Sequence, residues 1–270
     1  MVLDIGRALR TGLEELGSET GLVVVAVVLV FQLGYGAVVD SLRHQLAVIV
    51  APAGPSGGVG VVTGCGWSPL AAETSLPVLA TLALAGVVCN EVIRFWAIRC
   101  FADASATRVA DAGQRLRALV VLGGGFALLL FGLQHVVPML GLVWGVETMG
   151  AFARTSVVLS MLFVGVAVYL RQEIALNDGS LRRTVRNSVV RFLQEPVPIL
   201  GLLVLLSAVG FAAGIPRALT VMLDAGTVFG VSLGMAAHFV GVALTAVVQT
   251  LSIAAITDAY LQVRTDAGAL

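Results

Sequence analysis

The sequence has no lysine, few charged residues of any kind and few aromatic residues. Only 12% of its 270 residues are charged and 6% are aromatic, whereas 58% are hydrophobic. An ordinary soluble domain is about 25% charged, because it must present a wettable surface to water. The composition therefore excludes an ordinary soluble protein, and it predicts a protein that lies in lipid.

The chain also has no net charge, no cysteine pattern that predicts disulfides and no recognisable catalytic site motif. Sixteen basic and sixteen acidic residues balance, so the chain lacks the basic field of nucleic-acid-binding proteins. Cys89 and Cys100 are about 16 Å apart along a helix, which is too far for a disulfide, and Cys65 lies in a different loop. No CxxC, HxxxH, HExxH or Walker motif occurs. The pattern GxSxG occurs at residues 54–58 and 230–234, but it lies in a Gly/Pro-rich loop and in an apolar span, not at the strand-to-helix elbow of a hydrolase. We therefore expect free thiols, no metal site and no cofactor.

Six apolar stretches are long enough to cross a membrane, which requires about 20 residues. They cover approximately residues 21–39, 76–96, 117–137, 152–170, 197–215 and 226–255. The predicted fold is therefore an all-α, polytopic bundle of six transmembrane helices in one membrane domain, residues 21–262. Two further segments are predicted. One is a Gly/Pro-rich outer loop at residues 40–75, in which AVIV and VGVV can pair as a hairpin. The other is a C-terminal tail at residues 263–270.

Arginine placement predicts the orientation of this bundle. Thirteen arginines fall on the side of the two termini, and Arg43, Arg154 and Arg217 fall on the other side. Because positively charged loops remain in the cytoplasm, both termini are predicted to be cytoplasmic in a plasma membrane.

The first twenty residues do not resemble a secretory signal, since they contain four acidic residues and only two arginines. Ile5, Leu9, Leu13 and Leu16 recur at helical spacing. Residues 1–20 are therefore predicted to form an amphipathic helix on the cytoplasmic surface. A helix packed against other loops is the alternative.

The segment between the fourth and fifth spans, RQEIALNDGSLRRTVRNSVVRFLQEPVPILG, predicts a basic amphipathic helix. Its apolar face contains Leu181, Val185, Val189 and Phe192, and Pro196 and Pro198 prevent it from running into span five. The arginines on its other faces are Arg182, Arg183, Arg186 and Arg191. At a membrane surface each arginine contributes about 1 kcal/mol of attraction to anionic lipid. These four arginines either bind anionic lipid or a partner, or only determine the topology.

The loop between the second and third spans contains Glu91 and Arg94, three residues apart. This spacing predicts a helical extension with an exposed ion pair worth about 0.2–0.5 kcal/mol. The glycines at positions 123–125 lie within a span and do not form a phosphate-binding loop. Neither feature predicts a site.

The sixth span contains a polar stripe within 33 uncharged residues. His238, Thr245, Gln249 and Ser252 share one helical face, at steps of seven, four and three. Unpaired polar groups in lipid cost several kcal/mol, so the stripe should face protein or a wet cavity and the helix should lie in the middle of the bundle. The available polar partners in other spans are Gln32, Asn90, Gln134, His135 and Ser207.

Two interpretations of the stripe remain open. Its side chains either form interhelical hydrogen bonds that determine packing, or they line a path for a proton or a small solute. No Asp or Glu falls in the middle of the predicted spans. A row of small residues, Gly226, Gly230 and Gly234, leads to His238 and predicts close packing against another helix or a second subunit.

Three segments carry a resemblance to a known family. LDIGRALRTGLEELGSETGLVVVAV, RQEIALNDGSLRRTVRNS and TDAYLQV resemble a haloarchaeal family of six-helix integral membrane proteins of unknown function. That family is distantly similar to the membrane domain of some glycerophosphodiester phosphodiesterases. The resemblance implies a six-span fold in an archaeal plasma membrane. It does not imply phosphodiesterase activity, because we find neither an appended hydrolase domain nor a metal-binding cluster of His and carboxylates.

The sequence favours a non-enzymatic scaffold or accessory protein that engages anionic lipid or a partner through Arg182, Arg183, Arg186 and Arg191. The alternative is a small-solute or proton-coupled transporter that uses the stripe containing His238. A membrane-embedded enzyme using His135, Glu147 or Asp224 at the outer face is a third interpretation. The expected partners are membrane lipids and a second copy or another membrane protein, and not nucleic acid.

Overall fold

A computed structural model describes residues 3–50, 74–102, 112–133, 137, 146–177, 180–219 and 227–267. These residues form helices, and none of them lies in a strand. The helices are α1 (Ile5–Leu16), α2 (Glu19–Val50), α4 (Leu76–Phe101), α5 (Ala112–Phe131), α7 (Val146–Val166), α8 (Leu170–Leu176), α9 (Leu181–Gln194), α10 (Pro196–Leu219) and α11 (Val228–Ala267). The predicted all-α fold is confirmed.

Six helical segments are long and apolar enough to cross a membrane, as the sequence predicts. They are Glu19–Leu42, Leu76–Phe101, Gly113–Leu130, Gly150–Leu176, Pro196–Leu219 and Val228–Arg264. The fourth of these segments combines α7 and α8. The chain is therefore a multi-pass membrane protein by the length and composition of its helices.

Two predicted boundaries are wrong because the helices continue past them. α2 runs to Val50, so residues 40–50 are not part of a loop and the segment AVIV cannot form a hairpin strand. Residues 40–50 contain neither glycine nor proline, and the first proline follows at Pro52, so nothing interrupts the helix there. α11 likewise continues to Ala267, past the predicted end of the membrane domain at residue 262. Residues 51–73 and 268–270 lie outside the described part of the chain.

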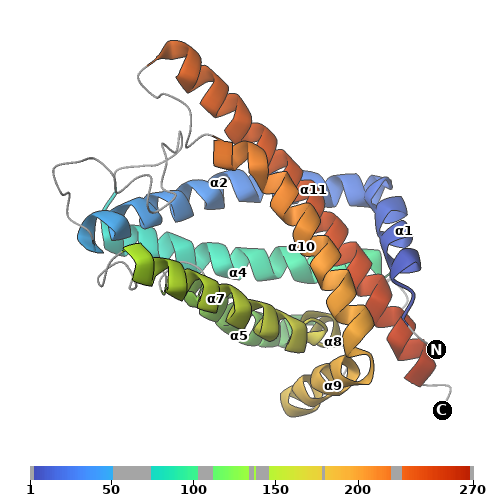
Figure 1. Cartoon of the computed structure of the whole chain (residues 1–270). Helices are drawn as coiled ribbons and strands as arrows, with labels where there is room; N and C mark the ends of the chain where they lie inside the picture. Colours follow the sequence, from blue (N-terminus) through green and yellow to red (C-terminus); the bar gives the residue numbers. More distant parts are fainter. Residues whose placement is uncertain are drawn as a thin grey trace.

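α11 is the central helix of the bundle. Figure 1 shows α10 and α11 side by side, crossing the group formed by α2, α4, α5 and α7. α11 contacts α1, α2, α4 and α10. In its most apolar stretch 44% of the residues are buried, against 22–29% in the other five candidate spans. The predicted central position of the sixth span is confirmed.

The N-terminal helix α1 packs against α11 rather than lying apart from the bundle. Ala8 and Gly12 are the buried residues of α1, and a side chain at Gly12 would come within 3.2 Å of Ala255. Small residues on both helices therefore allow a close approach. Of the predicted apolar face, Ile5 and Leu9 pack against the core, whereas Leu13 is 58% exposed.

α9 buries polar residues beside the predicted apolar face, of which Phe192 still packs against the core. Its buried residues are Thr184 and Ser188, whereas Val185 is 41% exposed. Thr184 Oγ1 donates to the carbonyl of Ser180 on its own helix, and Ser188 Oγ is buried without a partner among the described residues. α9 ends at Gln194 and α10 begins at Pro196, as the prolines predict.

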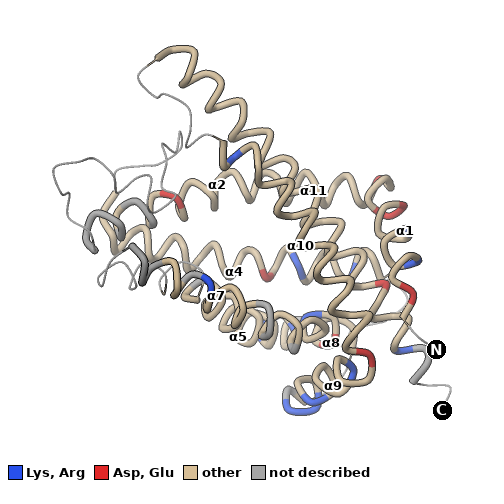
Figure 2. The backbone as a smooth tube through the Cα atoms, in the orientation of Figure 1, with Lys and Arg blue, Asp and Glu red and all other residues tan. Residues whose placement is uncertain are grey.

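Basic residues gather mainly around α8 and α9 and near the N-terminus, as Figure 2 shows. We call this the arginine-rich end of the bundle, defined by α1, α8 and α9. The N-terminal backbone is bonded to the α9–α10 junction and to α11: the amide of Leu3 donates to Glu195 Oε2 at 2.6 Å and that of Asp4 donates to Gln262 Oε1 at 3.1 Å.

Candidate functional site

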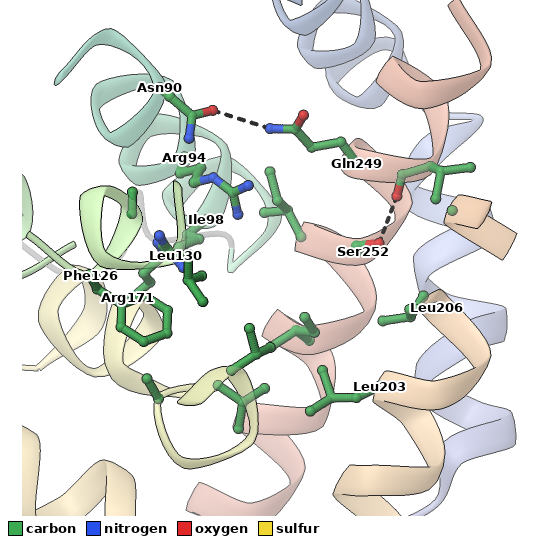
Figure 3. A pocket seen from close by; sticks show the side chains of 18 of the residues that line it. Asn90, Arg94, Ile98, Phe126, Leu130, Arg171, Leu203, Leu206, Gln249 and Ser252 are labelled. Atoms are coloured by element: carbon green, nitrogen blue, oxygen red, sulfur yellow. Dashed lines mark hydrogen bonds between the residues drawn. The ribbon is translucent and has the colours of Figure 1, made fainter. Parts of the chain in front are cut away.

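A cavity of about 500 Å³ lies between α2, α4, α5, α7, α8, α10 and α11. Its polar wall consists of Tyr35, Asn90, Arg94, Arg171, Gln172, Thr245, Gln249 and Ser252. Apolar residues, among them Phe126, Val168, Leu203, Leu206 and Ile256, form the remaining wall. In Figure 3 Arg94 points into the space between α4 and α11, with Asn90 and Gln249 close by. Three of the four residues of the predicted stripe therefore line one cavity.

A chain of amides crosses the bundle beside this cavity. Gln249 Oε1 accepts a hydrogen bond from Gln32 Nε2 at 2.5 Å, and Gln249 Nε2 donates to Asn90 Oδ1 at 3.3 Å. The chain connects α2, α11 and α4, and the second bond is drawn in Figure 3. Gln32 and Asn90 were expected partners of the stripe, and both contacts confirm that expectation. Ser207, another expected partner, is exposed on α10.

The two hydroxyl groups of the stripe are bonded to their own helix. Thr245 Oγ1 donates to the carbonyl of Gly241 and Ser252 Oγ donates to that of Val248, both at 2.7 Å. A hydroxyl that donates in this way keeps its oxygen lone pairs as acceptors. The cavity wall thus combines acceptor oxygens on α11 with donor guanidinium groups on α4 and α8.

Glu91 forms a buried ion pair that the sequence did not predict. Its side chain is fully buried, and it accepts from Arg171 Nε at 2.8 Å and from Arg171 Nη2 at 2.7 Å. This two-point geometry is the strongest form of an arginine–carboxylate pair. The Arg171 guanidinium also lies over the Phe126 ring, 5.6 Å from its centre. The predicted exposed pair between Glu91 and Arg94 is therefore wrong, because α8 supplies the partner from a distant part of the chain.

Gly123 makes room for the Glu91 carboxylate. A Cβ atom at Gly123 would collide with the carboxylate oxygen Oε2 of Glu91. The glycines at positions 123–125 do not form a phosphate-binding loop. The first of them, Gly123, is instead explained by its contact with the Glu91 carboxylate. A run of glycines in one span and a carboxylate near the end of the neighbouring span is the sequence pattern from which the buried position of Glu91 could have been predicted.

Arg94 is a charged residue of the cavity wall that has no ion-pair partner among the described residues. It lies on α4, one turn after Asn90, and its Nε atom is buried without a hydrogen-bond partner among the described residues. No ion pair within the described part of the chain involves Arg94, while both Arg171 and Glu91 are near enough to act on it electrostatically. Gln172 Oε1, also on the cavity wall, is a second buried atom without a described partner. The wall therefore presents an unused donor and an unused acceptor.

His238, the fourth residue of the stripe, lies outside the cavity lining. It is buried, with 2% of its surface exposed, and the charges of Arg217 and Asp40 act on it. Arg217 on α10 forms an ion pair with Asp40 on α2. Asp40 stands just after the predicted first span and Glu91 near the end of the predicted second span, and the structure brings both carboxylates into the bundle as partners of arginines.

A second polar network lies at the arginine-rich end. Arg191 Nε is 2.8 Å from Glu173 Oε1, whose side chain is 1% exposed. The Arg191 guanidinium lies 4.9 Å from the centre of the Tyr260 ring, and Asn177 Nδ2 donates to the Tyr260 hydroxyl at 2.5 Å. Arg191 thus connects α9 to α8 and α11 from inside the bundle.

The four predicted surface arginines therefore separate into two groups. Arg182, Arg183 and Arg186 are exposed on α9, whereas Arg191 is turned inward. Within the small-residue row, Gly230 and Gly234 are buried. Gly226, His135, Gln134, Asp224 and Cys65 lie outside the described residues, and the side chain of Glu147 is not described.

Comparison with known proteins adds no relative. No protein-family model, no curated protein and no solved structure matches the chain. The likeness to the haloarchaeal family therefore stays a prediction. Within the described ranges, no group of three or more His, Cys, Asp or Glu residues is placed to hold a metal ion.

Proposed function

We propose that this protein is a membrane carrier that binds a small solute in the cavity beside Gln249. The observation that carries the proposal is that Thr245, Gln249 and Ser252 line one cavity with Asn90, Arg94 and Arg171. A cavity of about 500 Å³ falls within the range of about 300–1,000 Å³ that small-molecule sites occupy. Ionisable residues inside a span mark solute or ion pathways in membrane proteins.

The charged groups along α11 support a pathway rather than isolated packing contacts. The Asp40–Arg217 pair and His238 lie toward one end of α11, and the Glu173–Arg191 pair contacts Tyr260 toward the other. The cavity lies between these two groups, because Thr245 and Ser252 fall between His238 and Tyr260 along the same helix. A carrier binds its substrate between two sides that open in turn, and this cavity has an ion pair toward each side.

Cysteine accessibility tests whether water reaches the cavity. In a variant with Cys65, Cys89 and Cys100 replaced by alanine, Thr245→Cys and Ser252→Cys are expected to react with a charged methanethiosulfonate reagent. A thiol reacts as its thiolate, which requires water, so we expect rates at least about tenfold above those of a lipid-facing position.

Leu244→Cys is the matched control, because Leu244 is on the same helix and 41% exposed on its outer face. Equal, slow labelling at all three positions would mean that the cavity is dry, and the carrier proposal would then be abandoned. Circular dichroism on each variant verifies that the helices are intact.

A second candidate function is engagement of anionic lipid or a partner at the arginine-rich end, with that end cytoplasmic in a plasma membrane. It is supported by the exposure of Arg182, Arg183 and Arg186 on α9 and by the thirteen arginines on the side of the termini. These three side chains can contact headgroups without disturbing the bundle.

Changing Arg182, Arg183 and Arg186 together to glutamine is expected to reduce the anionic lipid that remains bound after gentle extraction. Each removed arginine lowers the attraction by about 1 kcal/mol. The measurement is native mass spectrometry, and the control is the Arg154→Gln variant, which removes an exposed charge from α7, outside the arginine-rich end. Unchanged lipid in the α9 variant would leave these arginines with a role in topology alone.

A further inference from the structure

We propose that the ligand of the cavity is an amphipathic anion, whose acidic group pairs with Arg94 and whose apolar part lies against Phe126, Leu203 and Leu206. The proposal rests on the carrier function and names its substrate class. The acidic group, a carboxylate or a phosphate, can belong to a small solute or to a membrane lipid.

The charge of the wall is the first argument. Two guanidinium groups, Arg94 and Arg171, line the cavity, and Glu91 is engaged at both its oxygens by Arg171. One positive charge is therefore left without a carboxylate among the described residues. A buried charge is unfavourable unless it is paired and hydrogen-bonded, and an anion in the cavity would supply both the opposite charge and the acceptor oxygens.

The position of the hydrogen-bonding groups is the second argument. Arg94 Nε is a buried donor without a described acceptor, and Figure 3 shows the guanidinium pointing into the space between α4 and α11, below the bond that joins Asn90 and Gln249. Buried donors of this kind are rare in folded proteins and usually indicate a ligand or a water molecule. A carboxylate or phosphate accepts from the planar guanidinium group at two points, which no neutral solute of similar size does equally well.

The shape of the wall is the third argument. Phe126, Leu203 and Leu206 come from α5 and α10 and face the cavity from the sides away from the amide chain. An apolar wall of this extent attracts an apolar group, since each buried methylene is worth about 0.8 kcal/mol. Free inorganic anions would leave this wall in contact with water. An acidic group on an apolar chain matches both parts of the cavity.

The depth of Arg94 in the membrane allows the anion to be either a lipid headgroup or a solute from water. Arg94 lies seven residues before the last residue of α4, about 10 Å along the helix axis. This places it near the arginine-rich end of the span rather than at the middle. A lipid headgroup entering between helices and a solute entering from water can both reach such a depth.

The first test is the charge preference of the accessible cysteine. At Ser252→Cys, the anionic reagent sulfonatoethyl methanethiosulfonate is expected to react faster, relative to its rate with a free thiol, than the cationic trimethylammonioethyl reagent. Arg94→Gln should remove this preference, and Arg154→Gln, which changes an exposed arginine bonded to its own helix, should keep it. Reaction at equal relative rates would overturn the anion proposal and leave the carrier proposal standing, whereas absence of reaction would count against the carrier itself.

The second test uses octanoate as the probe and octanol as its uncharged counterpart. Octanoate is expected to raise the melting temperature of the delipidated full-length protein, and Arg94→Gln should weaken its binding at least about tenfold through loss of a charge-assisted contact. Asn90→Asp, which places a carboxylate one turn from Arg94, should fold normally and also lose binding. Equal stabilisation by octanol, unchanged in both variants, would contradict the proposal.

Native mass spectrometry of protein from its own membrane distinguishes the two sources. An anionic lipid that is present in the wild type and in Arg154→Gln, but lost in both Arg94→Gln and Asn90→Asp, would assign the site to a lipid headgroup. Octanoate binding without such a lipid would assign it to a small solute. Both results support an anion, while a bound neutral lipid that persists in all variants would overturn the proposal.

Discussion

Replacing Glu91 with alanine is expected to lower the free energy of unfolding by about 3–5 kcal/mol, because removal of one partner leaves a buried charge uncompensated. Glu91 is fully buried and holds Arg171 at two points. After the substitution, Arg171 and Arg94 would both face the cavity without a carboxylate. Titration with SDS in mixed micelles measures the change.

The double variant Glu91→Ala, Arg171→Ala provides the informative comparison. It removes both charges of the pair, so it should be more stable than Glu91→Ala alone. The exposed Glu14 on α1 serves as the control, and its change to alanine should alter stability by no more than about 0.5 kcal/mol. If Glu91→Ala costs less than about 1 kcal/mol, the paired carboxylate does not stabilise the bundle as the contacts indicate.

Replacing Arg191 with glutamine is expected to destabilise the protein by a similar amount, about 3–5 kcal/mol. Its guanidinium is the cation beside Glu173, whose side chain is 1% exposed, and it also lies over the Tyr260 ring. Without it, the Glu173 carboxylate keeps the side chains of Asn177 and Tyr260 as hydrogen-bond partners but has no described cation beside it. The same SDS titration measures the loss.

The triple variant of Arg182, Arg183 and Arg186 is the matched control for Arg191. These residues lie on the same helix but are exposed, so the stability of the triple variant should remain within about 0.5 kcal/mol of the wild type. A sequence reading that treats all four arginines as one surface predicts equal effects. Equal losses in the two variants would therefore contradict the inward position of Arg191.

Much of the fold follows from hydropathy and charge alone. The six spans follow from the length of the apolar stretches, and the central position of α11 follows from its polar stripe, since unpaired amides are unfavourable in lipid. Gln32 and Asn90 could be named as partners of Gln249 because few other polar groups occur in the spans.

The ion pairs could not be predicted, because their partners are far apart in the chain and the charges stand near the ends of spans. Glu91 and Arg94 are neighbours on one helix, so their spacing predicts a pair between them. The partner of Glu91 is instead Arg171 on α8. Asp40 stands just after the predicted first span, and only the continuation of α2 brings it inside the bundle.

The inward position of Arg191 could have been predicted from the sequence of α9. Thr184, Ser188 and Arg191 are spaced by four and three residues, so they share one face of α9. The buried face of α9 carries these polar groups, while its exposed surface is mixed and contains Val185 together with Arg182, Arg183 and Arg186. The usual rule for soluble helices, which places the apolar face inward, does not predict this burial.

The most direct test of the cavity as an anion site is cryo-electron microscopy of the protein in nanodiscs formed from its own membrane. The account predicts density with an acidic group within hydrogen-bond distance of Arg94, beside Asn90 and Gln249, and an apolar part against Leu203 and Leu206. Closure of α4 onto α11 with Arg94 paired to a carboxylate of the protein would contradict it.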